Sequence, residues 1–178
     1  MKQAVILFAA GLVALIAQSA LAVLVPHPFC PDLGLLVVVA IGLFWEPLPS
    51  GFALAAGLGY ATDVLSGSLL GQHGLLRLLS FAAARLGGRQ LNLRGPLPLA
   101  VFAAGLSVIY AVALQGGLGS FTGSASEVAA SIGRVGGHAL VNAIAAPFVA
   151  LGVERLCSWS SDDDAARRAL RLDARSAR

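Results

Sequence analysis

The first apolar segment of the chain, Gln3–Val25, reads QAVILFAAGLVALIAQSALAVLV and contains no charged residue. A helix needs about 20 mostly apolar residues to cross the hydrocarbon core of a bilayer, so this stretch predicts a membrane-spanning helix. The rest of the chain fits the same environment, because 57% of its 178 residues are hydrophobic and only 12% are charged. Soluble domains carry about a quarter charged residues. The composition excludes a soluble enzyme, a nucleic-acid-binding domain and a disordered chain, and it indicates an all-α, polytopic membrane protein.

Five more apolar segments follow, and Pro, Gly or charged residues separate them. The predicted spans cover about 3–25, 31–47, 50–70, 74–86, 97–118 and 132–156. After them come three aspartates and then arginines, a charge order that predicts a short separate helix beginning at Ser160 or Ser161. The sequence therefore predicts a bundle of six transmembrane helices in 1–157 and a charged cytoplasmic tail in 158–178.

The positions of the cations predict the orientation of the bundle. Cytoplasmic loops of membrane proteins carry an excess of Lys and Arg. With the N-terminus in the cytoplasm, only Arg77 and Arg134 fall elsewhere, and the cations on the cytoplasmic side are Lys2, Arg85, Arg89, Arg94, Arg155, Arg167, Arg168, Arg171, Arg175 and Arg178. Both termini are therefore predicted to be cytoplasmic. The alternative for the first segment is a cleavable signal peptide, which would leave five spans.

Two charged residues lie inside predicted spans. A carboxylate near the middle of a bilayer costs about 2.5–3.5 kcal/mol, so Asp63 calls for a partner. Arg77 lies at a similar depth on the next predicted span, and we expect the two to form an ion pair that locks these helices together. A proton or ligand site, or a polar contact with a partner helix, are the alternatives for the same residues.

Other polar side chains also lie within the apolar segments. His138 and Asn142 are one helical turn apart and share a face, which favours hydrogen bonds between helices. The sequence shows no nucleophile–base pair, no metal-ligand spacing and no phosphate-binding loop. We therefore expect no catalytic residue, no metal and no cofactor.

Small residues recur every four positions in the third segment, at Ala53, Gly57 and Ala61. Such a stripe lets helix backbones approach closely in a membrane. It predicts a packing face, either inside the bundle or against a partner helix, and packing inside the bundle is the favoured alternative.

A motif in the second to fourth segments carries a family resemblance. Pro31-Asp32-Leu33 opens the second segment, Gly57-Leu58 precedes Asp63, and the stretch from Gly67 to Gly71 follows it. This pattern resembles the rod shape-determining protein MreD family over about 31–85. The chain departs from that family where the second segment ends in Trp45-Glu46-Pro47 instead of a glycine.

The resemblance implies a non-enzymatic scaffold of the bacterial cell-elongation machinery in the inner membrane. Its implied partners are an MreC-like protein and also MreB, RodA and a class B penicillin-binding protein, which together direct peptidoglycan synthesis and cell shape. Membrane lipid is a further partner, and nucleic acid is not. The alternative is the substrate-binding membrane subunit of an energy-coupling factor vitamin transporter, whose fold and size are similar. That function would need converging polar groups, for which Asp63, Arg77, Tyr60, Gln115 and Asn142 are the candidates.

Overall fold

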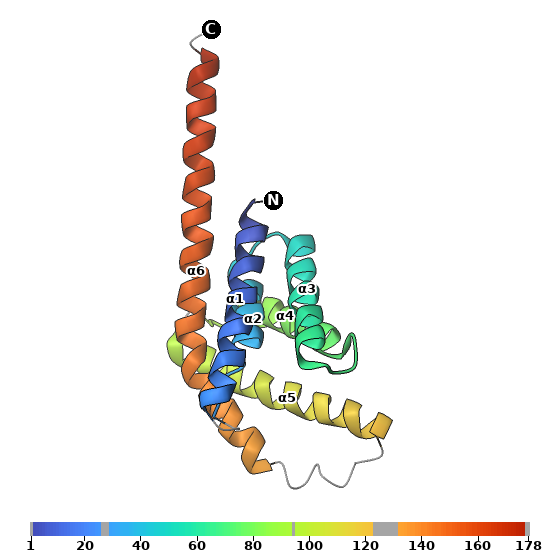
Figure 1. Ribbon diagram of the computed structural model, residues 1–178. Coiled ribbons are helices and arrows are strands. Elements are labelled where there is room, and N and C mark those ends of the chain that lie inside the picture. The colour runs from blue at the N-terminus through green and yellow to red at the C-terminus, as the bar shows by residue number, and fades with distance from the viewer. Residues whose placement is uncertain (1, 26–28, 94, 123–131, 177–178) are drawn as a thin grey trace.

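The computed structural model describes residues 2–25, 29–93, 95–122 and 132–176, with side chains except at 116–122, 132 and 160–176. Within these ranges the chain is all-α and forms six helices (Figure 1). Their bounds are α1 Lys2–Leu24, α2 Leu33–Phe44, α3 Leu48–Ser66, α4 Gln72–Gln90, α5 Pro96–Thr122 and α6 Ile132–Ser176. Each of the six apolar segments predicted from the sequence is therefore helical.

Three stretches of the described helices are long and apolar enough to cross a membrane: Lys2–Leu24, Pro96–Gln115 and Gly133–Trp159. They indicate a multi-pass membrane protein. The α2 helix is apolar but has only 12 residues, or about 18 Å at 1.5 Å per residue. That is less than the roughly 30 Å hydrocarbon core.

The α2 helix is the centre of the core. Its residues from Gly34 to Gly42 are all buried, and it packs against α1, α3, α4 and α6. A helix that is apolar on every side must be buried on every side, and in this chain other helices surround α2. Aliphatic and aromatic side chains from α3 and α4, among them Leu54, Leu58 and Phe81, complete the core around it.

Glycines let the inner helices cross closely. A Cβ built on Gly59 of α3 would lie 2.5 Å from the Cα atom of Gly74 in α4, so the two backbones touch. A Cβ on Gly42 of α2 would lie 2.8 Å from the Cβ of Ala84. Close approach of backbones is the main source of helix association in lipid, where burial of apolar surface supplies little.

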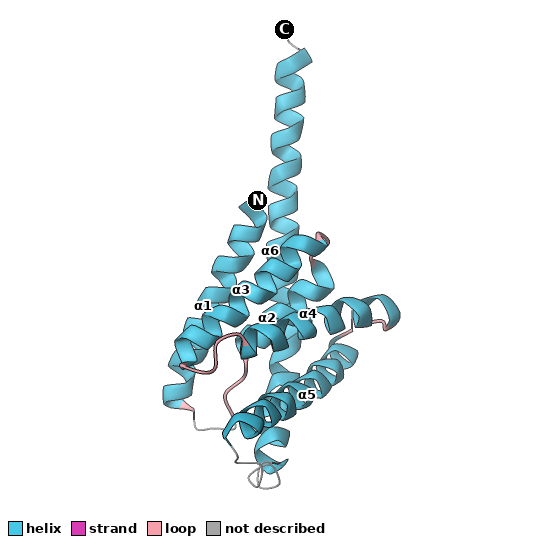
Figure 2. Ribbon diagram, turned by 90° about the vertical axis from the view of Figure 1, so that its right-hand side faces the viewer, coloured by secondary structure: helices cyan, strands magenta, loops and turns pink. Residues whose placement is uncertain are grey.

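The α5 helix is oriented differently from α1, α3 and α6. Figures 1 and 2 show it running obliquely across the bundle. It packs against α6 and α4, and its Leu106 and Tyr110 join Leu35, Val39 and Ala84 in a second apolar cluster.

The predicted separate tail helix is wrong. The α6 helix continues without a break from Ile132 to Ser176, so the tail prolongs the last apolar segment (Figure 1). The physical reason is in the sequence: no Gly or Pro occurs after Gly152, and nothing else there stops a helix. Pro147 lies inside the helix, a position that membrane helices tolerate.

Arg85 of α4 fixes the turn between α2 and α3. Its Nη1 donates to the carbonyl oxygen of Trp45 at 2.6 Å, and its Nη2 donates to that of Glu46 at 2.8 Å. Trp45 Nε1 donates to Ser50 Oγ at 2.8 Å. The Trp45-Glu46-Pro47 departure noted in the sequence is thus an ordered turn in which Arg85 satisfies the carbonyls left free at the end of α2.

Candidate functional site

Asp63 lies near the end of α3 and caps the start of α4. Its side chain is fully buried, and its carboxylate accepts the backbone N–H groups of Gly71 at 2.9 Å, His73 at 2.9 Å and Gly74 at 3.2 Å. The first N–H groups of a helix have no partner within the helix, and the helix dipole is positive there. A carboxylate meets both requirements, so Asp63 anchors one helix to the beginning of the next.

Two glycines make this cap possible. Gly67, at the end of α3, has φ 64°, and Gly71, directly before α4, has φ 92°. Both lie in the left-handed region that glycine adopts at little cost. A Cβ at either position would meet nothing within 4 Å, so backbone conformation and not space favours glycine here. The spacing Asp63–Gly67–Gly71 therefore encodes one turn.

Side chains of the turn close around the same carboxylate. His73 Nδ1 lies 2.9 Å from Asp63 Oδ1, and Ser68 Oγ donates to that oxygen at 3.1 Å. Only 13% of the His73 side chain is exposed. The Asp63 carboxylate is thus surrounded by donors from the turn and from the first residues of α4, and we call this group the local junction.

The predicted ion pair between Asp63 and Arg77 is wrong. The Arg77 side chain is fully buried, and its Nη2 lies 3.3 Å from Oδ1 of Asp32. Its Nη1 donates to the carbonyl oxygen of Leu58 at 3.1 Å. The pairing differs because the turn already satisfies Asp63, while Arg77, one turn further along α4, reaches α2.

Asp32 connects three helices. Its Oδ1 accepts the N–H of Leu35 at 2.9 Å, so it is the N-cap of α2, directly after Pro31. Its own N–H donates to Asn142 Oδ1 of α6 at 2.8 Å, and Asn142 Nδ2 donates to Ser107 Oγ of α5 at 2.9 Å. The hydrogen bonding between helices expected of Asn142 is confirmed. We call Asp32, Arg77, Asn142 and Ser107 the distributed junction.

Gly34 makes room for the Arg77 guanidinium. A Cβ on Gly34 would lie 2.5 Å from Arg77 Nη2 and 2.7 Å from Nη1, and also 2.5 Å from a methyl group of Leu15. The first turn of α2 therefore offers a bare backbone surface against which the guanidinium lies.

Several buried polar atoms near these junctions have no hydrogen-bond partner among the described residues: Gln72 Oε1, Arg77 Nε and Tyr110 Oη. All three belong to α4 or to the α5 residue that packs on it. Gln72 Nε2 reaches the carbonyl oxygen of Leu114 at 3.0 Å, and the rings of Tyr110 and His73 lie 6.0 Å apart. A fourth such atom, Arg85 Nε, lies at the turn between α2 and α3, so unsatisfied buried polar atoms occur at more than one contact of α4.

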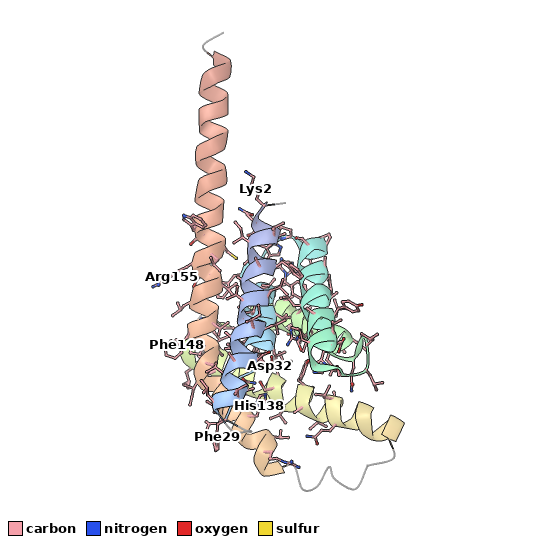
Figure 3. All side chains as sticks on the ribbon, in the orientation of Figure 1. Lys2, Phe29, Asp32, His138, Phe148 and Arg155 are labelled. Carbon is pink, nitrogen blue, oxygen red and sulfur yellow. The ribbon has the colours of Figure 1, made fainter. Side chains whose placement is uncertain are left out.

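The remaining predicted residues divide between interior and surface. A Cβ on Gly57 would lie 3.0 Å from the Phe8 ring of α1, and Ala61 packs against the core, whereas Ala53 is exposed. The stripe thus packs inside the bundle over part of its length, as favoured from the sequence. His138 is half-buried on α6, and Figure 3 shows it with Asp32 toward the end of the molecule opposite Lys2.

Sequence reasoning missed two members of the distributed junction. Asp32 entered only as part of a motif, although a buried arginine needs a carboxylate and Asp32 directly precedes an apolar helix. Nothing in the sequence marked Ser107.

Two of the cations on which the predicted orientation rests, Arg94 and Arg178, lie outside the described residues.

The chemistry available at the two junctions is that of charge neutralisation and helix capping. Among the described residues, no group of three or more His, Cys, Asp or Glu side chains is placed to hold a metal ion. Comparison of the chain with protein-family models, with curated proteins and with solved structures finds no match.

Proposed function

We propose that this protein is a membrane scaffold of the bacterial cell-elongation machinery, of the MreD type. The observation that carries the proposal is the role of the motif residues. Asp32 caps α2, Asp63 caps α4, and Gly67 and Gly71 form the turn between α3 and α4. The pattern that resembles the MreD family thus coincides with the residues that hold the inner helices together, as expected of a motif that maintains a shape.

The outer surface suits such a role. Large apolar side chains are exposed on the first and the last helix. They include Val13 and Val23 of α1 and Ile144 and Phe148 of α6. In a membrane these side chains face lipid or the helices of partner proteins. The proposed partner in the membrane is an MreC-like protein, with MreB, RodA and a class B penicillin-binding protein in the same machinery. The proposed activity is binding, without catalysis and without a cofactor.

The proposed topology has six spans in the inner membrane, with both termini in the cytoplasm; in it the short α2 crosses together with the turns at its two ends, enclosed by α1, α3, α4 and α6. In Figure 3 the cations Lys2 and Arg155 both lie farther along the bundle, away from the end where Phe29 and His138 are found. The proposed fold resembles the substrate-binding subunits of energy-coupling factor transporters. A periplasm-specific reporter placed after Arg178 should remain inactive, and activity would overturn this topology.

The test of the function is recovery of a complex from native membranes. Affinity-tagged protein should co-purify with the MreC-like protein of the same cell, and depletion of the chain should turn rods into spheres. Gly57→Leu is a matched structural control, because overpacking against Phe8 should lower the abundance of the whole protein and not only the yield of the complex. Normal rod shape after complete depletion would refute the proposal.

A second candidate function is the substrate-binding subunit of a vitamin transporter. Gln72 Oε1, Arg77 Nε and Tyr110 Oη, which have no hydrogen-bond partner within the described part of the chain, favour it, because a bound molecule could hydrogen-bond to them. Saturable vitamin uptake by the protein reconstituted with a transport ATPase would establish this function and exclude the scaffold. Co-purification with an MreC-like protein, together with no uptake, would exclude the transporter.

A further inference from the structure

The last part of α6 extends beyond the apolar window that ends at Trp159. Figures 1 and 2 both show it standing clear of the other helices and rising past the N-terminus of the chain. At 1.5 Å per residue, the roughly 17 residues from 160 to 176 add about 25 Å of helix. We call residues 160–176 the α6 extension.

Arginines occupy one side of the α6 extension by register. Arg167, Arg171 and Arg175 follow each other at intervals of four, and Arg168 is adjacent to the first of them. Successive residues of an α-helix are about 100° apart, so these four positions fall within an arc of about 100°. We call these four positions the arginine face. Asp164 falls within the same arc, ahead of the four arginines, and the opposite sector holds the positions of Ala165, Ala166, Ala169, Leu172 and Asp173.

An unsupported helix of this length needs additional stabilisation. Most helices in proteins are stabilised by packing against the rest of the fold, and this one is supported only at one end, by the rest of α6. The spacing of Asp163 with Arg167 and of Asp164 with Arg168 permits i,i+4 pairs, each of which contributes about 0.3–0.5 kcal/mol. Arg171 and Arg175 have no acidic residue four positions before them. By spacing, the extension therefore supplies these two arginines with no such i,i+4 pair.

The direction of the α6 extension distinguishes between a lipid and a protein partner. Because α6 continues without a break, the arginine face lies about 12–24 Å beyond Trp159 along the helix axis. The attraction of an anionic bilayer surface decays within a Debye length of about 8–10 Å. With the bilayer surface taken at Trp159, where the apolar stretch of α6 ends, most of the arginine face is beyond this range, whereas a protein beside the extension can reach all of it.

We infer that the arginine face docks onto an acidic surface of a cytoplasmic protein. Arg guanidinium groups form paired hydrogen bonds with carboxylates, and a row of them at intervals of four matches an acidic helix or strand edge laid alongside. The inference requires the C-terminus to be in the cytoplasm. It does not depend on which machinery the protein belongs to.

The first experiment locates the partner by photocrosslinking of the full-length protein in living cells. A photoreactive amino acid replaces Ala174, which lies next to the arginine face, or Ala169, which lies opposite to it. A single cytoplasmic protein should crosslink from position 174 and not from position 169. Equal crosslinking from both positions, or none from position 174, would overturn the inference.

Two triple variants then test the charge. Arg167→Ala/Arg171→Ala/Arg175→Ala and Ala165→Glu/Ala166→Glu/Ala169→Glu each lower the net charge by the same amount, but on opposite sides of the helix. At equal abundance, the arginine variant should reduce the crosslinked yield about tenfold, as expected for the loss of several exposed charge pairs. The alanine variant should change the yield less than about twofold. An equal loss in both variants would mean that the net charge alone matters, and it would refute docking.

A third experiment tests whether the arginine face binds the membrane surface instead of a protein. The full-length protein, with both native cysteines replaced and a fluorophore at Ser176→Cys, is placed in nanodiscs that contain lipid-attached quencher. Quenching should be the same with and without phosphatidylglycerol. An increase with this anionic lipid would assign the arginine face to the bilayer and overturn the inference. A crosslinked protein that is foreign to the elongation machinery would leave the docking intact and count against the proposed function.

Discussion

The local and the distributed junction are built around the same residue type but hold the fold in different ways. Asp63 and Asp32 are both buried, and each caps the N-terminus of a helix. Asp63 meets three backbone N–H groups and His73, all within 11 residues of the sequence. The Asp32 carboxylate accepts one backbone N–H group of its own helix. The other partners of Asp32 among the described residues, Arg77 and Asn142, lie 45 and 110 residues away in the sequence. The first junction therefore depends on the conformation of a turn, and the second depends on the balance of charge between distant segments.

The largest effect should come from removing the cation of the distributed junction. Arg77→Met would leave the Asp32 carboxylate without its counter-charge, and we expect the free energy of unfolding to fall by about 3–5 kcal/mol. Unfolding of the purified protein in detergent measures this. The additional change Asp32→Asn should recover part of the loss, because asparagine also caps helices and carries no charge. Arg89→Met, at an exposed position of α4, is the control and should change stability by less than about 0.5 kcal/mol.

Removal of the anion of the local junction should have the next largest effect. Asp63→Ala strands the N–H groups of Gly71, His73 and Gly74, and we expect a loss of about 2–3 kcal/mol. Asp63→Asn, which retains one carbonyl oxygen, should fall between this variant and the natural protein. The same unfolding measurement applies, and limited proteolysis should show that the turn at 67–71 opens first. A loss below about 1 kcal/mol for the alanine variant would show that this turn holds without its carboxylate.

Asn142→Ala should have a smaller effect and should separate the two junctions. It removes the acceptor for the Asp32 N–H and the donor to Ser107, with an expected loss of about 1–2 kcal/mol. Combined with Arg77→Met, it should give a non-additive loss, because both residues act on Asp32. Combined with Asp63→Ala, the losses should add within about 0.5 kcal/mol. Additivity in both double variants would mean that the distributed junction is not one unit.

The smallest effect should follow from strain alone. Gly71→Ala places a side chain where nothing lies within 4 Å but where φ is 92°, so we expect a loss of about 1 kcal/mol, at the lower end of the cost of a left-handed residue. Gly71→Asn should cost less, because asparagine tolerates the left-handed region better. Gly105→Ala in α5 also meets nothing within 4 Å, and it should stabilise the helix by about 0.5–1 kcal/mol. Equal effects at positions 71 and 105 would contradict the backbone explanation for the local junction.

The contrast between the junctions also explains what the sequence could predict. The six helices follow from apolar runs bounded by Pro and Gly, and the turn after Asp63 is a local pattern that a motif can capture. The partner of Arg77 was not predictable in the same way. The carboxylates of Asp32 and Asp63 are both within possible reach of Arg77. Which of them it contacts depends on the register of α4 against α2 and α3.

Two features of the outer part of the fold also escaped prediction, for different reasons. The oblique course of α5 depends on how side chains such as Phe102 and Tyr110 fit against α4 and α2, which composition does not reveal. The unbroken α6 was recognisable in principle from the absence of Gly and Pro after Gly152. The charge pattern at Ser160 and Ser161 suggested a helix start, but a preceding helix that has no reason to end takes precedence over a possible cap.

Gly34 has a consequence for how this chain can change over time. The guanidinium of Arg77 occupies the space where a Cβ of residue 34 would stand, so a larger residue at position 34 and an arginine at position 77 exclude each other. Loss of the arginine would remove that conflict, leaving only a methyl group of Leu15 close to the Cβ, and would at the same time leave Asp32 unbalanced. Positions 32, 34 and 77 are therefore expected to be inherited together: among descendants of this sequence, substitutions at one should appear with substitutions at the others, although the three lie on two different helices and a cap.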